Sequence, residues 1–212
     1  MPGPAPSGLV VLPIFPLPGL TFFPHTLLPL HIFEARFRAM VSDSLARDRR
    51  LAVVGLKPGY EAAYEGKPAV YQVAGAGEII QWERLATGRF NILLRGDNRI
   101  WIEVELPTDT LYRVVRARVL EDEIPDGADP LAREVQRVTE ACLGLLRAHG
   151  QLSPQVEQAL RSARGPGVVA DQIASAVIPD PLLRQELLET LDVRRRLERL
   201  AAALDDLLRQ VS

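Results

Sequence analysis

Two histidines and a glutamate are the side chains in this sequence that come closest to a metal site. His25, His31 and Glu34 lie within one short stretch. A zinc site needs three or four converging ligands, and the remaining histidine, His149, lies far along the chain. We therefore predict a structural role for His31, and we expect no metal and no other cofactor.

Glu34 is also the first residue to consider for proton transfer. A general acid or base needs a cleft and a partner group, and the sequence supplies neither. Because a helical pattern begins at Glu34, we predict instead that Glu34 and Arg36 form a helix cap and an ion pair. The single cysteine, Cys142, falls on the apolar stripe of a predicted helix, so we expect a buried structural thiol and no intrachain disulfide.

The sequence lacks the motifs of the common nucleotide-binding and hydrolytic sites. A Gly-Lys pair at 66–67 is followed by proline, and its upstream spacing does not fit a P-loop. Gly75 and Gly77 lack the third glycine of a dinucleotide fingerprint. The only lysines, Lys57 and Lys67, lie in one loop without a serine partner. We therefore predict that the protein is not an enzyme and has no catalytic residues.

The composition is that of a folded protein without a strongly charged partner. The 212 residues carry a net charge of −2 and are 47% hydrophobic, which gives no support to general polyanion binding. No apolar run is long enough to span a membrane, and residues 1–8 resemble a disordered tail rather than a signal peptide. We expect a cytoplasmic protein with no membrane partner.

The elements that would position these residues follow from proline, apolar periodicity and turn residues. The segment 12–38 contains five prolines within its first eighteen residues, so it predicts short strands at 10–14 and 27–32 rather than a long helix. Helical spacing then predicts an amphipathic helix over about 34–48. A buried strand is predicted at 51–56, and further strands at 70–73, 78–85, 90–95, 99–106 and 112–120.

Two tight turns connect the later predicted strands. Gly88 lies in a hairpin turn between 85 and 89, and Gly96-Asp97-Asn98 predicts a second turn. The alternation from Ile100 to Leu106 predicts one buried face with Ile102 and Val104, and one wet face with Trp101, Glu103 and Glu105. Many short strands with tight turns favour a small closed sheet.

The last third of the chain is helical in pattern. An acidic segment at 121–130 contains Gly and Pro and predicts a linker between domains at 9–120 and 131–212. Helices are predicted from Leu131 onwards, at 153–163, 168–177 and 182–191, and along a final seam from Val193 to Val211. We therefore predict an α+β protein, with a small β-barrel and one amphipathic helix followed by a C-terminal helical bundle.

Three stretches resemble the Lon protease amino-terminal (substrate-binding) domain family. They are LPIFPLPG at 12–19, PLHIFEARF at 29–37, and EIIQWERL with GRFNILL and Gly96 at 78–96. Ala35, Thr87 and Trp101 depart from the family pattern, which has proline, aspartate and a polar residue there. The motif residues are Pro29, His31, Glu34, Arg36, Gly88, Arg89, Gly96 and Arg99.

The resemblance implies a PUA-like β-barrel followed by a helical bundle, in a stand-alone form without the ATPase and peptidase domains. It also implies a non-catalytic module that binds exposed apolar segments of unfolded or client proteins, for use by an ATP-dependent protease. Aromatic side chains are the commonest anchors in such surfaces. The candidate protein-binding residues are Leu20, Phe22, Phe23, Tyr60, Tyr64, Trp82 and Trp101.

Three alternatives stay open at this point. The loop that carries Phe22 and Phe23 could fold back and close the barrel end instead of presenting both rings. RNA binding would require a basic stripe, which Arg84, Arg89, Arg95 and Arg99 could form, although glutamates lie among them. The helical half could also dock one dedicated protein partner. The sequence does not define an oligomeric state.

Overall fold

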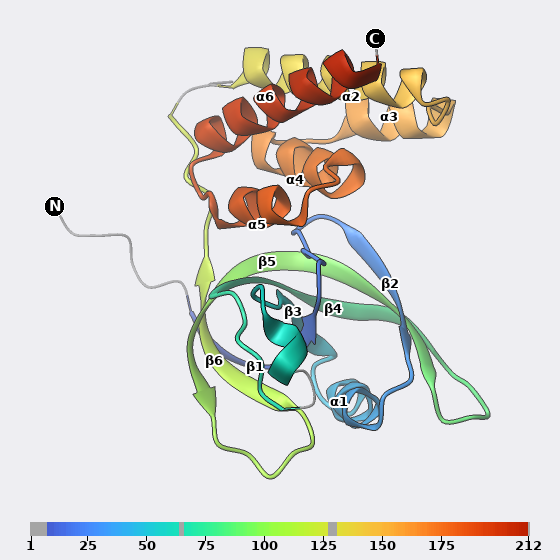
Figure 1. The fold of residues 1–212 in the computed structure, drawn as a ribbon, viewed down its shortest axis with the longest axis vertical. Coiled ribbons are helices and arrows are strands. Elements are labelled where there is room, and N and C mark those ends of the chain that lie inside the picture. Colours follow the sequence, from blue (N-terminus) through green and yellow to red (C-terminus); the bar gives the residue numbers. More distant parts are fainter. Residues whose placement is uncertain (1–7, 64–65, 127–130, 212) are drawn as a thin grey trace, which may run out of the picture. The chain divides into compact units, whose positions relative to one another are not determined.

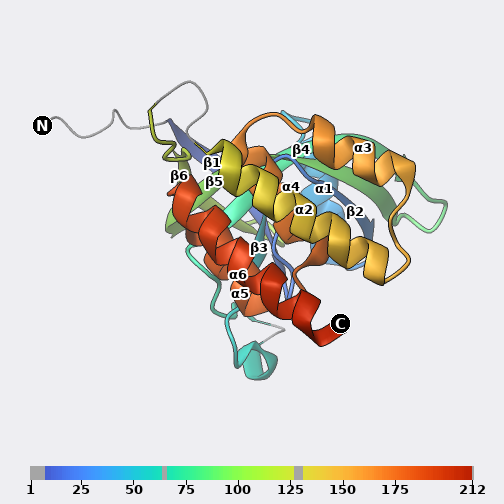
Figure 2. The same ribbon diagram turned by 90° about the horizontal axis from the view of Figure 1, so that it is seen from above.

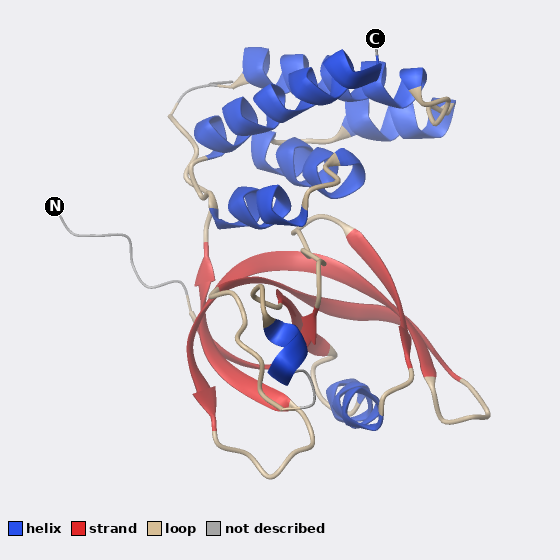
Figure 3. Cartoon of the chain, viewed as in Figure 1, coloured by secondary structure: helices blue, strands red, loops and turns tan. Residues whose placement is uncertain are grey.

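The structure is a computed structural model that describes residues 8–63, 66–126 and 131–211. The chain divides into two compact units, Met1–Glu121 and Asp122–Ser212. We call these the β unit and the helical unit. Figure 3 shows that the described strands lie in the β unit, together with helix α1 and the short 3₁₀ helix η1. The α+β class predicted from the sequence is confirmed.

The β unit is built on one curled sheet (Figure 1). Its strands are β1 (Leu9–Leu17), β2 (Leu27–Ile32), β3 (Arg50–Gly55), β4 (Val73–Arg84), β5 (Phe90–Leu106) and β6 (Arg113–Leu120), and its helices are α1 (Ala35–Leu45) and η1 (Tyr60–Ala63). The strand order is β2-β5-β4-β3-β1-β6, and a further β5–β6 pairing closes five of the strands into a barrel. β1 and β3 pair in parallel, and the other neighbours are antiparallel.

Alternation along the strands produces two apolar clusters in the β unit. Ile14 points into the barrel with Ile100 and Ala117. Its neighbour Phe15 points to the opposite face, where it packs with Phe37 of α1 and Ile79 of β4. Successive side chains of a strand face opposite ways, so a strand that is apolar on both faces can contribute to both cores.

β5 is one continuous strand of seventeen residues, so the turn predicted at Gly96-Asp97-Asn98 is wrong. β4 pairs with β5 along this length, with irregularities in register after Ala76 and after Ile79. Gly96 is required for a close backbone approach rather than for a turn, because a Cβ atom there would lie 2.2 Å from the carbonyl oxygen of Phe23. The other predicted turn is confirmed, since Gly88 has a φ of 75° and its N–H donates to the carbonyl of Leu85.

The loop before β2 folds back onto β4 and β5. A Cβ atom at Gly75 would lie 1.9 Å from the carbonyl oxygen of Phe22, so the loop backbone sits directly on the strand. The N–H of His25 donates to the carbonyl of Gly96 at 2.9 Å and fastens the loop there. As a result, Phe22 and Phe23 are buried. The prediction that they are exposed anchors is corrected, and the alternative of a folded-back loop holds.

The helical unit contains α2 (Ala132–Ala148), α3 (Pro154–Ser162), α4 (Pro166–Val177), α5 (Pro181–Glu189) and α6 (Val193–Val211). α2 and α6 lie side by side in both views (Figure 1 and Figure 2). Ser153 caps α3 by accepting a hydrogen bond from the N–H of Val156, and Pro154 follows it as predicted. Cys142 is buried on α2, and burial raises the pKa of its thiol to about 11. A buried thiol at this position is confirmed.

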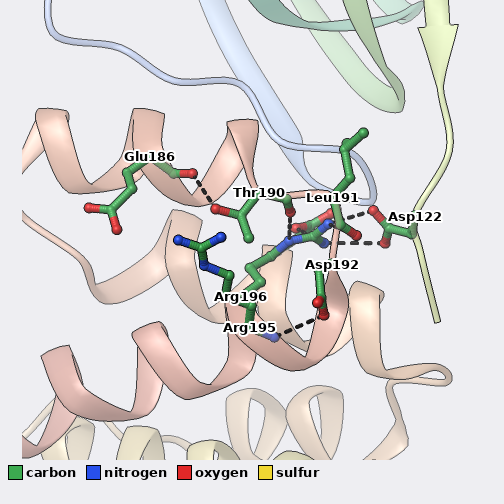
Figure 4. A network of polar contacts seen from close by, with 8 residues as sticks. Asp122, Glu186, Thr190, Leu191, Asp192, Arg195 and Arg196 are labelled. Atoms are coloured by element: carbon green, nitrogen blue, oxygen red, sulfur yellow. Dashed lines mark hydrogen bonds and ion pairs between the residues drawn. The ribbon is translucent and has the colours of Figure 1, made fainter. Parts of the chain in front are cut away.

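A buried arginine joins the start of the helical unit to its last helix (Figure 4). Arg196 of α6 is fully buried and contacts Asp122 at 2.5 Å and Asp171 of α4 at 3.1 Å. Its other N–H groups donate to the carbonyls of Thr190 and Leu191. Asp122 accepts two hydrogen bonds, and Asp171, Thr190 and Leu191 accept one each. These five bonds use all five N–H donors of the guanidinium.

The first residues of the predicted linker belong to this network. Glu123 exchanges backbone hydrogen bonds with Leu191 and Val193 at the start of α6. Asp122 packs so closely on α4 that a Cβ atom at Gly167 would lie 2.2 Å from its carboxylate. Residues 127–130 of that predicted linker and residues 1–7 of the predicted tail lie outside the described residues.

Candidate protein-recognition surface

An exposed apolar patch lies on the outer face of β1, β6 and β5. The strand register places its residues in two rows that run across the three strands. In the first row, Arg118 pairs with Leu9 on one side and with Trp101 on the other. Arg116 pairs in the same way with Val11 and Val104. Adjacent strands lie about 4.8 Å apart, so each row spans about 10 Å. We call these six residues, with Glu103, the outer sheet patch.

The four apolar side chains of the outer sheet patch are strongly exposed. Leu9 is 63% exposed, Val11 59%, and Trp101 and Val104 each 41%. Single exposed apolar residues are normal on proteins, but a contiguous group indicates a binding surface. Tryptophan and arginine are also the residue types most enriched among the anchors of protein interfaces.

An irregularity in β5 assembles this patch. Trp101 and Val104 are three residues apart and would point to opposite faces of a regular strand. A register shift between Ile102 and Val104 inserts an extra residue, Glu103, and turns both side chains outwards. The prediction that Val104 lies on the buried face is therefore wrong. After the bulge the alternation is inverted, and Glu105 is placed beside Arg113 instead of on the wet face.

The charges of the patch are partly paired. Arg118 donates to one carboxylate oxygen of Glu103 at 2.8 Å, and Arg116 lies 3.4 Å from the other. The hydrogen bond from Arg118 is the main reason why the pKa of Glu103 is lowered from its ordinary value. Glu103 is therefore ionised at neutral pH, and the patch carries one net positive charge.

A groove of about 340 Å³ continues from this patch along the C-terminal end of α1. Val11, Pro13 and Val114 form its apolar side, and Ser44 and Arg47 belong to its polar side. Ser44 is buried, and its hydroxyl has no hydrogen-bond partner in the described part of the chain.

The two predicted tryptophan anchors lie far apart. Trp82 is 45% exposed and packs under the guanidinium of Arg49 at 4.7 Å. It pairs with Ile92, whereas Trp101 lies nine residues further along β5. At about 3.3 Å per residue, these nine residues correspond to about 30 Å measured along the strand. Only Trp101 belongs to the outer sheet patch.

The other predicted binding residues do not join either tryptophan. Leu20 is half-buried against the cluster under α1, and Tyr60 is half-buried in η1. Tyr64 lies outside the described residues. The sequence did not single out Leu9, Val11, Val104, Arg116 or Arg118. The strand predicted at 10–14 carried no prediction of an exposed face, and no sequence signal marks the bulge at Glu103.

Several motif residues make contacts within the β unit. His31 contacts the side-chain oxygen of Asn91 through Nδ1 at 2.8 Å, and Pro29 is an exposed residue of the same strand. Glu34 is the N-cap residue of α1, but its side chain makes no capping bond. It pairs with Arg36 at 2.9 Å, so the predicted ion pair is present and the predicted side-chain cap is not.

The four arginines considered for RNA do not form a stripe. Arg99 is buried, and Arg95 is paired with Glu78 at 2.9 Å. Arg84 lies over the ring of Phe90, and Arg89 is exposed in the hairpin turn. Among the described residues, no three His, Cys, Asp or Glu side chains converge in a way that could hold a metal ion. No described helix is long and apolar enough to cross a lipid bilayer.

The fold matches solved amino-terminal domains of Lon proteases. The N-terminal domain of the Mycobacterium avium complex Lon protease superposes with a TM-score of 0.73 at 18% identity, covering 93% of this chain and 99% of that one. The Lon N-terminal domain protein from Xanthomonas campestris superposes with a TM-score of 0.63 at 21% identity, covering 91% and 98%. The class of fold is therefore that of a Lon N-terminal domain.

The sequence comparison defines the family. The family described as the ATP-dependent protease La (LON) substrate-binding domain matches residues 11–206. The chain thus belongs to the Lon substrate-binding domain family. It is 26% identical to the Lon protease of Xanthomonas oryzae pv. oryzae over 92% of its length, and 28% identical to Lon protease 2 of Myxococcus xanthus, also over 92%. The chain spans only 23% and 24% of the length of these two relatives.

Proposed function

We propose that this chain is a non-catalytic recognition module that binds exposed apolar segments of unfolded or client proteins through the outer sheet patch. The observation that carries the proposal is the bulge at Glu103, which turns Trp101 and Val104 outwards together. Apolar residues from an unfolded client would cover these side chains, and the aliphatic stems of Arg116 and Arg118 would extend the contact.

The proposal includes an ATP-dependent protease of the Lon type as the partner that uses the bound client. Family membership supports it, because the matched family is named for substrate binding. The cytoplasmic location expected from the sequence is part of the same proposal. RNA binding gains no support from the buried Arg99 and the paired Arg95.

The direct test compares the two tryptophans, since they are the only ones in the chain. The full chain is titrated with reduced, carboxymethylated α-lactalbumin, a permanently unfolded protein, and binding is followed by light scattering or calorimetry. Trp101→Ser should weaken binding about tenfold, as expected for an anchor of an interface. Trp82→Ser is the matched control and should leave the affinity within about twofold.

Two results would contradict the proposal. Equal losses for the two variants would mean that the outer sheet patch is not the site. Binding that persists in Trp101→Ser but is lost on a double substitution in the helical unit, Leu182→Ser with Val211→Ser, would favour the adaptor alternative. Both of these helical side chains are exposed, so their replacement should not disturb folding.

A further inference from the structure

A second concave site lies in the β unit, apart from the outer sheet patch. A pocket of about 220 Å³ is formed by the beginning of α1, the segment 66–68, the end of β5 and the connection to β6. We call it the barrel-end pocket. It is smaller than the roughly 300–1,000 Å³ of pockets that hold drug-sized ligands, so it suits the end of a chain rather than a whole folded partner.

Apolar side chains form the floor and the rim of this pocket. Phe37 and Leu56 are buried, and the ring of Tyr112 is held by a hydrogen bond from its hydroxyl to Asp43 at 2.8 Å. Leu111, in contrast, is 70% exposed and has little to pack against. An apolar group that enters the pocket would therefore meet a preformed floor and would cover Leu111.

Charged side chains line the same pocket in an unequal ratio. Glu105 is shared by two cations, because Arg113 donates to it at 2.9 Å and Lys67 lies 3.1 Å away. Arg36 is paired with Glu34 at 2.9 Å. Counting Glu34, which pairs with Arg36 but does not line the pocket, three cations and two carboxylates leave one net positive charge. Arg113 also donates to the carbonyl of Pro68, so this guanidinium is held in place.

The surplus charge is available to a ligand through Lys67. Its side chain is 74% exposed, and an ammonium group has three N–H donors, of which Glu105 needs one. Desolvation by burial acts to raise the pKa of the Glu105 carboxyl group, but the hydrogen bonds and the charges of Arg113 and Lys67 together lower it. Glu105 is therefore ionised at neutral pH and neutralises one of the two cations beside it. A ligand carboxylate can bind here because one positive charge remains.

We propose that the barrel-end pocket binds the C-terminus of a polypeptide that ends in an apolar residue. The apolar side chain would occupy the floor over Phe37 and Leu56, and the terminal carboxylate would pair with Lys67. A single carboxylate matches a single surplus charge. This site goes beyond the proposed function, because it recognises a chain end rather than an internal apolar segment.

The test uses a peptide with and without its terminal charge. Fluorescein-labelled Gly-Ser-Gly-Ala-Ala-Leu, with a free carboxylate or a C-terminal amide, is titrated with the full chain and followed by fluorescence anisotropy. The acid should bind about tenfold or more tightly than the amide, since a hydrogen bond to a charged group is lost in the amide. Equal affinities for acid and amide would overturn the proposal.

The two lysines provide a matched pair of variants. Lys67→Gln should weaken binding of the peptide acid about threefold to fivefold, as for a partly exposed ion pair. Lys57→Gln removes the same charge from the same loop, but Lys57 does not line the pocket, so the affinity should stay unchanged. Equal effects of the two substitutions would contradict the assignment of the carboxylate to Lys67.

Two further measurements test whether the apolar rim contributes to binding and whether the carboxylate must belong to a polypeptide. Leu111→Ser should weaken binding of the peptide acid about threefold, because less apolar surface is covered. 4-Methylpentanoate alone should compete only weakly, and competition as strong as that of the peptide would contradict a polypeptide ligand. The effect of Trp101→Ser on the binding of unfolded α-lactalbumin concerns the outer sheet patch alone, so its failure leaves the difference between peptide acid and amide intact.

Discussion

The two units of this chain use their apolar residues in different ways. Among the described residues, eight large apolar side chains are exposed in the β unit and four in the helical unit. In the helical unit, the seam of α6 is buried from Val193 to Leu204. In the β unit, a strand that is apolar on both faces leaves Leu9 and Val11 in solvent. The helical unit thus buries most of its large apolar side chains, and we propose that the β unit uses part of its exposed ones for recognition.

The unfolding of the two units can be followed by two different spectroscopic signals. Trp82 and Trp101 both lie in the β unit, so tryptophan fluorescence reports the unfolding of that unit. Most described helical residues lie in the helical unit, so far-ultraviolet circular dichroism at 222 nm reports mainly that unit. A substitution that acts on one unit should move one signal and leave the other in place.

The largest expected effect is in the helical unit. Arg196→Met leaves Asp122 and Asp171 without their buried cation, and should lower the free energy of unfolding of the helical unit by about 3–5 kcal/mol. Urea unfolding followed at 222 nm measures it. Arg195→Met is the control, because Arg195 is exposed, and should stay within about 0.5 kcal/mol. A matching shift of the fluorescence transition would contradict separate units.

The thiol of the helical unit gives the next effect. Burial raises the pKa of Cys142 from 9.0 to about 11, so the reactive thiolate should be about 100-fold rarer near neutral pH. Labelling with Ellman's reagent at pH 8 should therefore be slow in the native protein and rapid in 6 M guanidinium chloride. Because the pKa of the thiol is higher in the folded than in the unfolded protein, the free energy of unfolding also depends on pH. The contribution of the protonated thiol is fully present below pH 9 and is lost as the pH rises towards 11. Fast native labelling would contradict burial on α2.

A smaller effect is expected in the β unit. Gly96→Ala places a methyl group against the carbonyl of Phe23, and should lower the free energy of unfolding of that unit by about 1–3 kcal/mol. The tryptophan fluorescence transition should shift while the signal at 222 nm changes little. Gly8→Ala is the control, since nothing lies within 4 Å of a Cβ atom there. An unchanged Gly96→Ala protein would mean that the loop does not sit on β5.

The smallest effect concerns the end of one helix. Ser153→Ala removes the side-chain acceptor at the N-cap of α3, and should cost about 1 kcal/mol in the helical unit. Ser153→Asp keeps an acceptor and should retain the stability. If Ser153→Ala and Ser153→Asp unfold at the same urea concentration, the capping bond does not contribute.

The sequence predicted most elements, because proline, turn residues and helical spacing act locally. The strand at 27–32 and the proline-capped helix after Ser153 are examples. It failed at Gly96, where glycine serves a contact with a loop distant in sequence, and at Val104, where a bulge inverts the alternation. The outer sheet patch could not be predicted for the same reason, since it depends on register across β1, β6 and β5.

The most direct test of the central claim is a titration followed by ¹H–¹⁵N NMR of the two indole N–H groups. An apolar peptide without a free carboxylate is added to the ¹⁵N-labelled full chain, and a Trp101→Phe sample assigns the two signals. The account predicts that the Trp101 signal shifts or broadens and that the Trp82 signal stays in place. A shift of Trp82 with an unchanged Trp101 would contradict recognition by the outer sheet patch.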